Sequence, residues 1–296
     1  MLATCPRPRT IAGVAVVLLL GIVLSACGSS EGASGNDESR QSESDITIEH
    51  KFGSTRVPAD PRRVVSLGYT EQDALVLFDV QPIAELDPDL IMGLTAGLTD
   101  VEYEKLSQIA PTVVQPAEYP DFATPWQVQT LVTGEVFGQR ERAEEIVAEV
   151  ESLFDAAVDA HPELEGTTLA LSGPSYEGQY PFHASGDART RFFLELGLEV
   201  PDELDEIAGD RFYGGLSREQ ASMLDTDVLV WQSGSDAERS EIEADPVLSA
   251  LPVVRDGRSL FIEGDDYAAL QFMSALSLPH LLESFVPQLA EAVGGT

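Results

Sequence analysis

The sequence predicts an α/β protein with two lobes, each built on a parallel sheet, joined by one long helix. Three observations lead to this prediction. Strand-like and helix-like segments alternate over residues 45–138, a helical pattern without glycine fills residues 139–162, and the alternation resumes over residues 163–296. Such alternation is typical of strand–helix–strand units, in which neighbouring strands are parallel.

The first lobe is expected to span residues 45–138. Its strands are short apolar runs, and its helices carry apolar residues at helical spacing. Thr99 is placed to cap the second helix. The expected strands are 46–58 (with a turn), 62–70 and 111–116, and the expected helices are 71–79, 100–110 and 125–138.

The linking helix is expected over residues 139–162. Its apolar residues form one stripe, as in a helix that buries one face. They are Ile146, Val147, Val150, Leu153, Phe154 and Val158. In the second lobe we expect strands at 167–173, 226–234 and 257–264, and helices at 188–197, 217–225 and 274–294, the last broken near Pro279.

Polar and aromatic residues follow the expected strands at their carboxyl ends. Ligands bind there in parallel sheets, so these side chains suit recognition better than core packing. They are Tyr69, Thr70, Thr95, Tyr119, Tyr176, Tyr180, Phe182, Gln232, Ser233, Asp265, Asp266 and Tyr267.

The N-terminal residues are predicted to lie outside the fold. Arg7 and Arg9 precede an uncharged apolar run, 11–24, that is short for a membrane span. Small residues follow it, and the whole pattern indicates an export signal over residues 1–26. The end of this segment, Leu24-Ser25-Ala26-Cys27, resembles a bacterial lipobox, in which the signal is cut before the cysteine and the cysteine is lipidated. A plain signal peptide with an incidental cysteine is the alternative.

Residues 27–44 are rich in small polar residues and are expected to form a flexible tether. If Cys5 leaves with the signal and Cys27 carries lipid, the mature chain has neither a disulfide nor a thiol catalyst. The formal net charge is −34. Such a surface repels nucleic acid and anionic lipid headgroups, which argues against a nucleic-acid partner.

Motifs for covalent catalysis are absent from the sequence. The segment 173–178, GPSYEG, lacks the spacing of a serine nucleophile elbow, and no phosphate-binding loop occurs. The four histidines are scattered without metal-ligand spacing. Acid-pair catalysis stays open, because the many acidic residues always supply pairs.

Eight stretches that cover nearly all of the chain after Asp45 occur in a characteristic order. They are 61–84, 88–94 (PDLIMGL), 103–113, 124–130 (TPWQVQT), the long helix, 186–198 (GDARTRFFLELGL), 216–231 and 245–262. With them the chain resembles the substrate-binding lipoproteins of bacterial ABC importers, in the branch for iron–siderophore and vitamin B12-type ligands. The resemblance implies two lobes around a cleft, joined by one rigid helix, and no enzymatic activity.

Two further apolar runs, 81–84 and 90–94, are each predicted to be a buried strand, and only a few residues separate them. Neighbouring parallel strands need a crossover of about a dozen residues or more. The resemblance implies that a helix-containing segment is missing between Ala84 and Pro88, so that the N-terminal lobe is shortened. An unusual tight link is the alternative.

The shortened N-terminal lobe affects the expected docking to the permease. The resemblance implies that each lobe presents a surface acid to arginines of the permease. The turn Ser217-Arg218-Glu219-Gln220 matches the family's motif in the second lobe, which makes Glu219 its docking acid. Glu85 is the candidate in the first lobe. We also expect Ser217 and Glu219 to form a capping box.

Basic and aromatic residues are the expected ligand contacts. The resemblance implies that a basic residue after the Gly186-Asp187 turn faces the anionic siderophore, and a guanidinium holds two oxygens well. Arg189 and Arg191 follow this turn, with surface pairing to Glu195 as the alternative. The other candidates are Arg211 (beside Phe212 and Tyr213), Tyr69, Trp126, Tyr180 and Tyr267, and for Trp126 core packing is the alternative.

We therefore expect a monomer anchored by lipid to the outer face of the cell membrane, which binds a ferric siderophore and delivers it to an ABC permease. No cofactor and no metal site are expected, because the siderophore supplies all the iron ligands. The alternatives are a corrinoid or haem receptor of the same fold, an exported α/β hydrolase, and a surface protein without a transport function.

Overall fold

A computed structural model describes residues 45–68, 70–78 and 88–294. All of them belong to one compact unit, Ser42–Thr296. Some of the sequence predictions concern residues that the structure does not describe. Cys27, Tyr69 and Glu85 lie outside the described residues, as does the shortened link between Ala84 and Pro88.

The described chain begins with a β-hairpin, in the segment where the sequence predicts a strand and a turn. Its strands, β1 (Ile46–His50) and β2 (Gly53–Val57), pair antiparallel, with His50 opposite Gly53. Gly53 has φ +115°, a conformation open to glycine and disfavoured by side chains. Ile48 and Val57 pack into the core beneath the hairpin.

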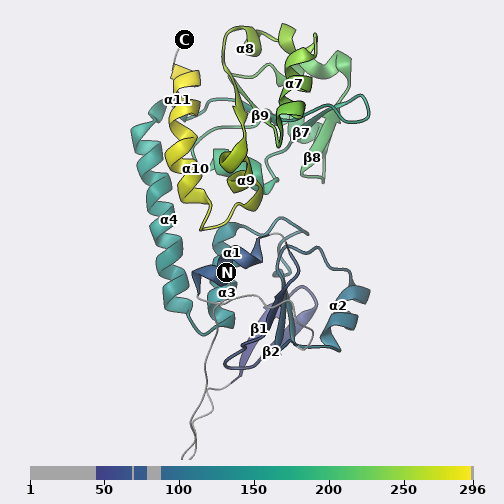
Figure 1. Cartoon of the computed structure of the whole chain (residues 1–296), viewed down its shortest axis with the longest axis vertical. Coiled ribbons are helices and arrows are strands. Elements are labelled where there is room, and N and C mark those ends of the chain that lie inside the picture. The colour runs from purple at the N-terminus through teal and green to yellow at the C-terminus, as the bar shows by residue number, and fades with distance from the viewer. Residues whose placement is uncertain (1–44, 69, 79–87, 295–296) are drawn as a thin grey trace, which may run out of the picture. The chain divides into compact units, whose positions relative to one another are not determined.

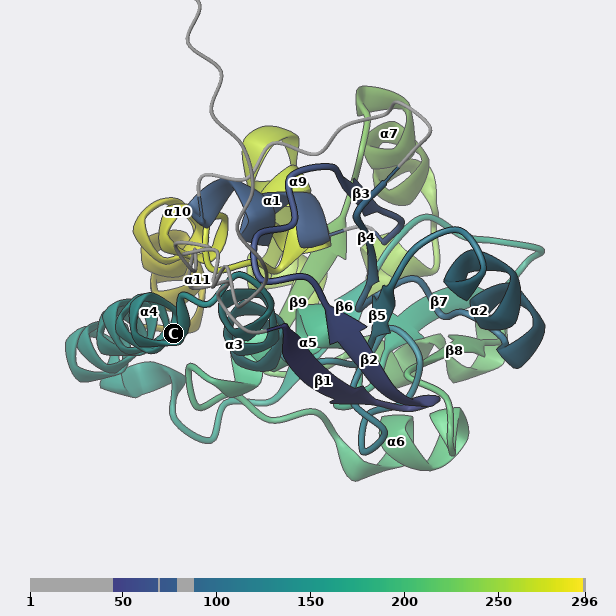
Figure 2. The ribbon, with the colours of Figure 1, turned by 90° about the horizontal axis from the view of Figure 1, so that it is seen from below.

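A three-stranded parallel sheet follows, in the order β3-β4-β5. It lies in the lower half of the molecule as drawn in Figure 1, and its strands are labelled in Figure 2. Its strands are β3 (Val64–Ser66), β4 (Leu90–Gly93) and β5 (Thr112–Val114), and the helices around it are α1 (Glu71–Leu77), α2 (Asp100–Ser107) and α3 (Trp126–Val136). Thr99 caps α2 in a capping box with Glu102, which confirms the predicted cap. We call β1 to α3 the N-terminal lobe.

The long helix α4 (Arg140–Ala160) lies beside α3 (Figure 2) and also packs against α10 of the second lobe (Leu278–Ser284). Ile146, Val147, Val150 and Phe154 are buried, as predicted. Leu153 is 43% exposed, because it lies at the edge of the buried stripe. The helix thus connects the two lobes, and its buried face packs against residues of both.

The second sheet has five strands, in the order β10-β9-β6-β7-β8. They are β6 (Leu169–Ser172), β7 (Tyr180–His183), β8 (Tyr213–Leu216), β9 (Val228–Gln232) and β10 (Ser259–Ile262). The expected parallel pairing holds for β10, β9 and β6, but β7 and β8 pair antiparallel. The link from β6 to β7 is too short for a parallel crossover, so the chain turns back at the bridge between Tyr176 and Gln179.

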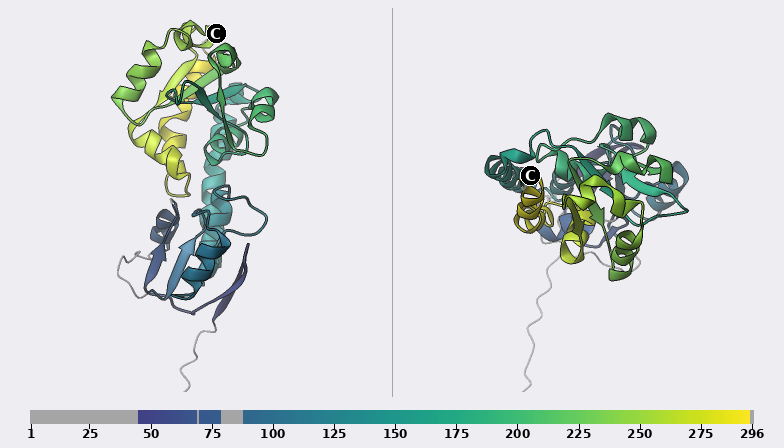
Figure 3. Two further views of the ribbon diagram at one scale, coloured as in Figure 1. Left: turned by 90° about the vertical axis from the view of Figure 1, so that its right-hand side faces the viewer. Right: turned by 90° about the horizontal axis from the view of Figure 1, so that it is seen from above.

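Helices surround this sheet, and we call β6 to α11 the C-terminal lobe (Figure 3). They are α5 (Ala188–Leu194), α6 (Asp202–Ala208), α7 (Asp236–Ala244), α8 (Pro252–Arg255), α9 (Gly264–Phe272), α10 and α11 (Val286–Gly294), with 3₁₀ turns η1 (Pro162–Leu164), η2 (Arg218–Leu224) and η3 (Leu248–Ala250). The expected helix over 217–225 is therefore a 3₁₀ helix. The closing helix breaks at Phe285, before Pro287, whereas Pro279 lies in the first turn of α10, where proline is tolerated.

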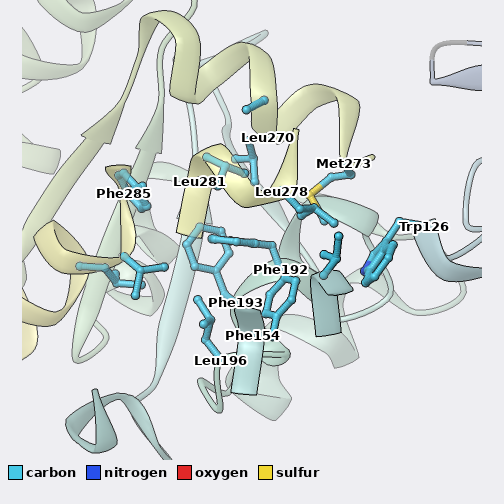
Figure 4. Close-up of a cluster of buried hydrophobic side chains, with 14 of the residues drawn as sticks. Trp126, Phe154, Phe192, Phe193, Leu196, Leu270, Met273, Leu278, Leu281 and Phe285 are labelled. Atoms are coloured by element: carbon cyan, nitrogen blue, oxygen red, sulfur yellow. The ribbon is translucent and has the colours of Figure 1, made fainter. Parts of the chain in front are cut away.

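One buried apolar cluster draws on both lobes (Figure 4). Trp126 of α3 stacks on Phe154 of α4, and Phe192 of α5 meets Phe154 edge-on. The cluster continues through Phe193 to Phe285. Among the described residues, no helix has the length and apolar character needed to cross a membrane.

Candidate functional site

A cavity of about 570 Å³ is lined by residues from both lobes, a size within the usual range for small-molecule sites. The N-terminal lobe contributes Thr70, Thr95, Phe122, Ala123 and Gln129, and the C-terminal lobe contributes Gly186, Asp187, Ala188, Arg189, Phe212, Gln271, Phe272 and Met273. The site therefore depends on elements that lie far apart in the sequence.

A small polar network forms the wall on the N-terminal lobe. Thr70 Oγ1 donates to Gln129 Oε1 at 2.6 Å, and Gln129 Nε2 donates to the Thr124 carbonyl at 2.9 Å. The Thr70 and Thr95 hydroxyls lie 3.4 Å apart. These three wall residues, Thr70, Thr95 and Gln129, are nearly buried, so the network presents fixed, uncharged polar atoms to the cavity.

Glu71 supports this wall from behind. Its side chain is fully buried, and Oε1 accepts bonds from Thr95 N at 2.6 Å and Thr95 Oγ1 at 3.1 Å. The carboxylate packs on Gly68 so closely that any side chain there would collide with it. Burial raises the pKa of Glu71, and the bonds from Thr95 only partly oppose this rise. Glu71 therefore acts on the site through Thr95.

The wall on the C-terminal lobe is built around the first turn of α5. Asp187 is the N-cap of this helix, and its Oδ1 accepts from Arg189 N at 2.9 Å. The Arg189 guanidinium donates back to Asp187, from Nε to Oδ1 at 2.9 Å and from Nη2 to Oδ2 at 2.8 Å. This two-point ion pair fixes the arginine at the cavity surface.

The charge of Asp187 is stabilised by its partners. Burial alone would raise the pKa of Asp187, but hydrogen bonds from His183 and Arg189 together hold that pKa below its usual range. His183 Nδ1 lies 3.0 Å from Asp187 Oδ2. The Asp187–Arg189 pair is thus ionised at neutral pH.

A second set of bonds connects Arg189 to the sheet. Arg189 Nη1 donates to Gln271 Oε1 at 3.2 Å, and Gln271 Nε2 donates to Gln232 Oε1 at 2.8 Å. Gln232 ends β9, at the carboxyl edge where the sequence predicts recognition residues. The guanidinium is therefore held in place by α5, α9 and β9 together.

Two phenylalanines form aromatic walls, Phe122 from the N-terminal lobe and Phe212 from the C-terminal lobe. Phe122 has φ +64°, which is unusual for a residue with a side chain, and it is 45% exposed. Its ring packs directly over Gly97, where no Cβ would fit. Strained backbone of this kind concentrates at ligand sites.

Contacts between the lobes lie beside the cavity. Arg191 Nη1 donates to the Ala123 carbonyl at 2.8 Å, and Trp126 Nε1 donates to Glu195 Oε2 at 3.3 Å. Burial raises the pKa of Glu195, and bonds from Trp126 and Gln127 oppose this rise. Arg191 therefore holds the loop that carries Phe122 and Ala123 instead of lining the cavity itself.

Among the predicted ligand contacts that are described, Arg189 alone lines the cavity. Trp126 is 4% exposed and packs in the core, and Tyr180 is 2% exposed, with its hydroxyl donating to Asp245 at 2.9 Å. Tyr267 lies within α9, against Gly234. Arg211 is exposed, and its Nε donates to the Ala208 carbonyl at 3.4 Å.

Other cavity residues could be anticipated only in part. Thr70 and Thr95 follow expected strands, so the strand-end argument selects them, and Phe212 stands beside Arg211 in the sequence. Gln129 and Gln271 carry no such signal, because they sit inside helices. Among the described residues, no group of three or more His, Cys, Asp or Glu side chains could hold a metal ion.

The capping box at η2 differs from the prediction. Ser217 is the cap, but its partner is Gln220, whose Oε1 accepts from Ser217 N at 3.2 Å. Glu219 is the second residue of the turn, one place too early to reach back. It is exposed and remains available to a partner.

A family model for periplasmic binding proteins matches residues 12–265. Among curated proteins, "Probable siderophore-binding lipoprotein YfiY" of Bacillus subtilis is 26% identical over 73% of this chain and 77% of its own length. "Fe(3+)-citrate-binding protein YfmC" of the same organism is 22% identical over 84% of this chain and 88% of its own length.

Solved structures show the same fold. A periplasmic solute binding protein from Mycobacterium smegmatis is 30% identical with a TM-score of 0.74, covering 84% of this chain and 99% of that one. The iron-uptake protein PiaA of Streptococcus pneumoniae, solved with ferrichrome, is 20% identical with a TM-score of 0.71, over 85% of this chain and 99% of that one. The predicted α/β fold is confirmed, and these are binding proteins rather than enzymes, as expected.

Proposed function

The chain belongs to the periplasmic binding protein family, and on this premise we propose that it captures a ferric siderophore in the cavity between its lobes and delivers it to an ABC permease. The observation that carries the proposal is the cavity itself. Both lobes line it, two phenylalanines flank it, and Arg189 is fixed at its surface. Relatives named for siderophore and ferric citrate binding support this ligand class.

The chemistry of the wall suits a preassembled iron complex. A siderophore surrounds its iron with its own donor atoms, so the receptor needs to supply only hydrogen bonds and apolar contact. The uncharged polar atoms of Thr70, Thr95 and Gln129 and the Phe122 and Phe212 rings supply these. A haem receptor would offer an axial His or Tyr, and none lines the cavity among the described residues.

Anchoring and delivery complete the proposal. Cys27 carries the lipid and residues 28–44 form the tether, so the two lobes work at the outer face of the cell membrane. Glu219, exposed on η2, meets arginines of the permease, and Glu85 is the corresponding acid of the N-terminal lobe. The boundaries at residues 26, 44, 138 and 162 belong to the same proposal, as does a monomeric receptor.

The experiment that tests capture is a titration of the protein with ferric siderophores, followed by quenching of tryptophan fluorescence. Corrinoid and haem are titrated in the same way, because they are the ligands of the alternative receptors. Saturable quenching by a ferric siderophore alone would support the proposal. Binding of haem or corrinoid alone would contradict it.

A matched pair of variants locates the binding. Phe212→Ala removes a ring from the cavity wall, whereas Tyr213→Ala removes the neighbouring ring, which is 50% exposed and lines no part of the cavity. Losing the buried contact of one aromatic ring costs about 1.5–3 kcal/mol. We therefore expect F212A to weaken binding roughly tenfold or more and Y213A to leave it unchanged. Equal effects would place the ligand elsewhere.

A further inference from the structure

We propose, on the premise of the proposed function, that the cavity selects a ferric chelate without net charge, of the trishydroxamate kind, over a trianionic ferric triscatecholate. The two classes differ in proton count. Three hydroxamates each lose one proton, which balances the charge of the ferric ion. Three catecholates each lose two and leave a trianion.

The cavity wall contributes one cation and one anion among the described residues, and they neutralise each other. Arg189 and Asp187 share two hydrogen bonds, of 2.9 and 2.8 Å, and Asp187 is only 3% exposed. An arginine whose charge is already balanced by a buried carboxylate offers little net attraction to an anion. It still offers N–H donors to an uncharged ligand oxygen, because a guanidinium has five.

The other arginine of α5, Arg191, does not add a free positive charge to the cavity wall. Its Nη1 donates to the Ala123 carbonyl at 2.8 Å, and Arg191 is not among the residues that line the cavity. Glu195 lies with it in the adjoining hollow, which also contains Trp126. The acid offsets the arginine at this second position.

The remaining wall is apolar or uncharged. Its apolar members are Phe122, Ala123, Ala188, Phe212, Phe272 and Met273, its polar members are Thr70, Thr95, Gln129 and Gln271, and Gly186 contributes backbone only. A multiply charged ligand that leaves water for such a surface loses hydration that the wall does not replace. The chain's net charge of −34 adds long-range repulsion. An uncharged chelate meets neither penalty.

The test compares two defined probes on the full chain, ferrichrome as the neutral trishydroxamate and ferric enterobactin as the trianion. We expect ferrichrome to bind at least tenfold more tightly, with a dissociation constant that stays nearly constant between low and high salt. Binding of ferric enterobactin with equal or higher affinity overturns the inference but leaves the proposed function intact. If neither probe binds but another ferric siderophore does, the inference is overturned and the proposed function stands. If no ferric siderophore binds, both fail.

One substitution tests the charge balance itself. Asp187→Asn removes the counter-charge of Arg189 and keeps a side chain that caps helices well. We expect the preference to shift toward ferric enterobactin by about tenfold relative to the unmodified chain. Asp236→Asn changes the total charge equally at an exposed position of α7, outside the cavity, and is expected to change nothing.

An unchanged preference in D187N overturns the inference. A thermal melt first shows whether D187N is folded. If it is not, Gln271→Glu, which adds a carboxylate beside Arg189, serves in its place, and it should lower the affinity for the trianion more than for ferrichrome.

Discussion

Glu71 shows how a residue that does not line the cavity controls one that does. Its carboxyl group is fully buried and accepts both donors of Thr95, and its second oxygen, Oε2, has no hydrogen-bond partner among the described residues. A buried carboxyl in this position favours its protonated form, which explains the raised pKa. The wall on the N-terminal lobe therefore depends on a carboxyl group, that of Glu71, whose ionised form is destabilised by burial.

This arrangement predicts a pH effect on stability. The pKa of Glu71 is higher in the folded state than its ordinary value of 4.5, so the folded state binds the proton more tightly. Its contribution is fully present at low pH and is lost as the pH rises from about 4.5 through the folded pKa. Glu71→Gln removes this loss.

The melting temperature of both proteins between pH 4 and 8 checks the effect. We expect the difference between E71Q and the unmodified chain to grow in favour of E71Q as the pH rises. A difference that stays constant with pH would show that the Glu71 carboxyl is not perturbed by burial.

At the scale of elements, the loop that carries Phe122 depends on Gly97. Gly97 has φ +59°, and a Cβ there would collide with the Phe122 ring. Gly138, which follows α3, has φ +64° but open space around it. Substitutions at the two glycines therefore distinguish the effect of backbone strain from the effect of displacing the Phe122 ring.

The substitutions Gly97→Ala and Gly138→Ala use this contrast. Each forces alanine into a left-handed conformation, which costs roughly 1–2 kcal/mol. G97A also displaces Phe122, so we expect it to weaken ligand binding severalfold, whereas G138A should only lower the melting temperature. Unchanged affinity in a folded G97A would exclude Phe122 from the binding wall.

A second element, η2, presents Glu219 to solvent. Glu219→Gln is expected to reduce siderophore-dependent growth without changing the ligand affinity, because the residue lies outside the cavity. Glu206→Gln, at an exposed position of α6, is the control. If E219Q supports growth as well as E206Q does, Glu219 is not a docking residue.

The sequence predicts elements well where pattern and propensity agree. The parallel strands of both sheets and α4 follow from period and length alone, whereas the second strand of the hairpin was not distinguished from the first. The strands β7 and β8 were not expected, because Pro181 and the pair Gly214-Gly215 are residues that sheets avoid. The structure explains Gly214, since a Cβ there would strike the Phe182 ring.

The candidate site could be predicted from the sequence to a smaller extent than the fold could. Arg189 follows a recognisable turn, and Thr70 and Thr95 follow strands. Gln271 lies in α9, whose pattern did not indicate a helix, and Tyr180 turns its ring into the core from β7. Which side chains meet across two lobes depends on packing that one-dimensional patterns do not contain.

For the whole molecule, the cavity exists because the lobes are tied together beside it. Ser274 Oγ donates to Asp73 Oδ2 at 2.7 Å, and Arg191 reaches the Ala123 carbonyl, so both ties join residues from opposite lobes. The cluster around Phe154 continues the connection along α4. The cavity is therefore a property of the assembled lobes and not of either lobe alone.

The most direct test of this account is anomalous X-ray scattering at the iron edge from crystals of the protein grown with ferrichrome. The account predicts one iron peak within the cavity, flanked by Phe122 and Phe212 and beside Arg189. An iron peak elsewhere on the protein, or no ordered iron in crystals of protein saturated with the chelate, would contradict it.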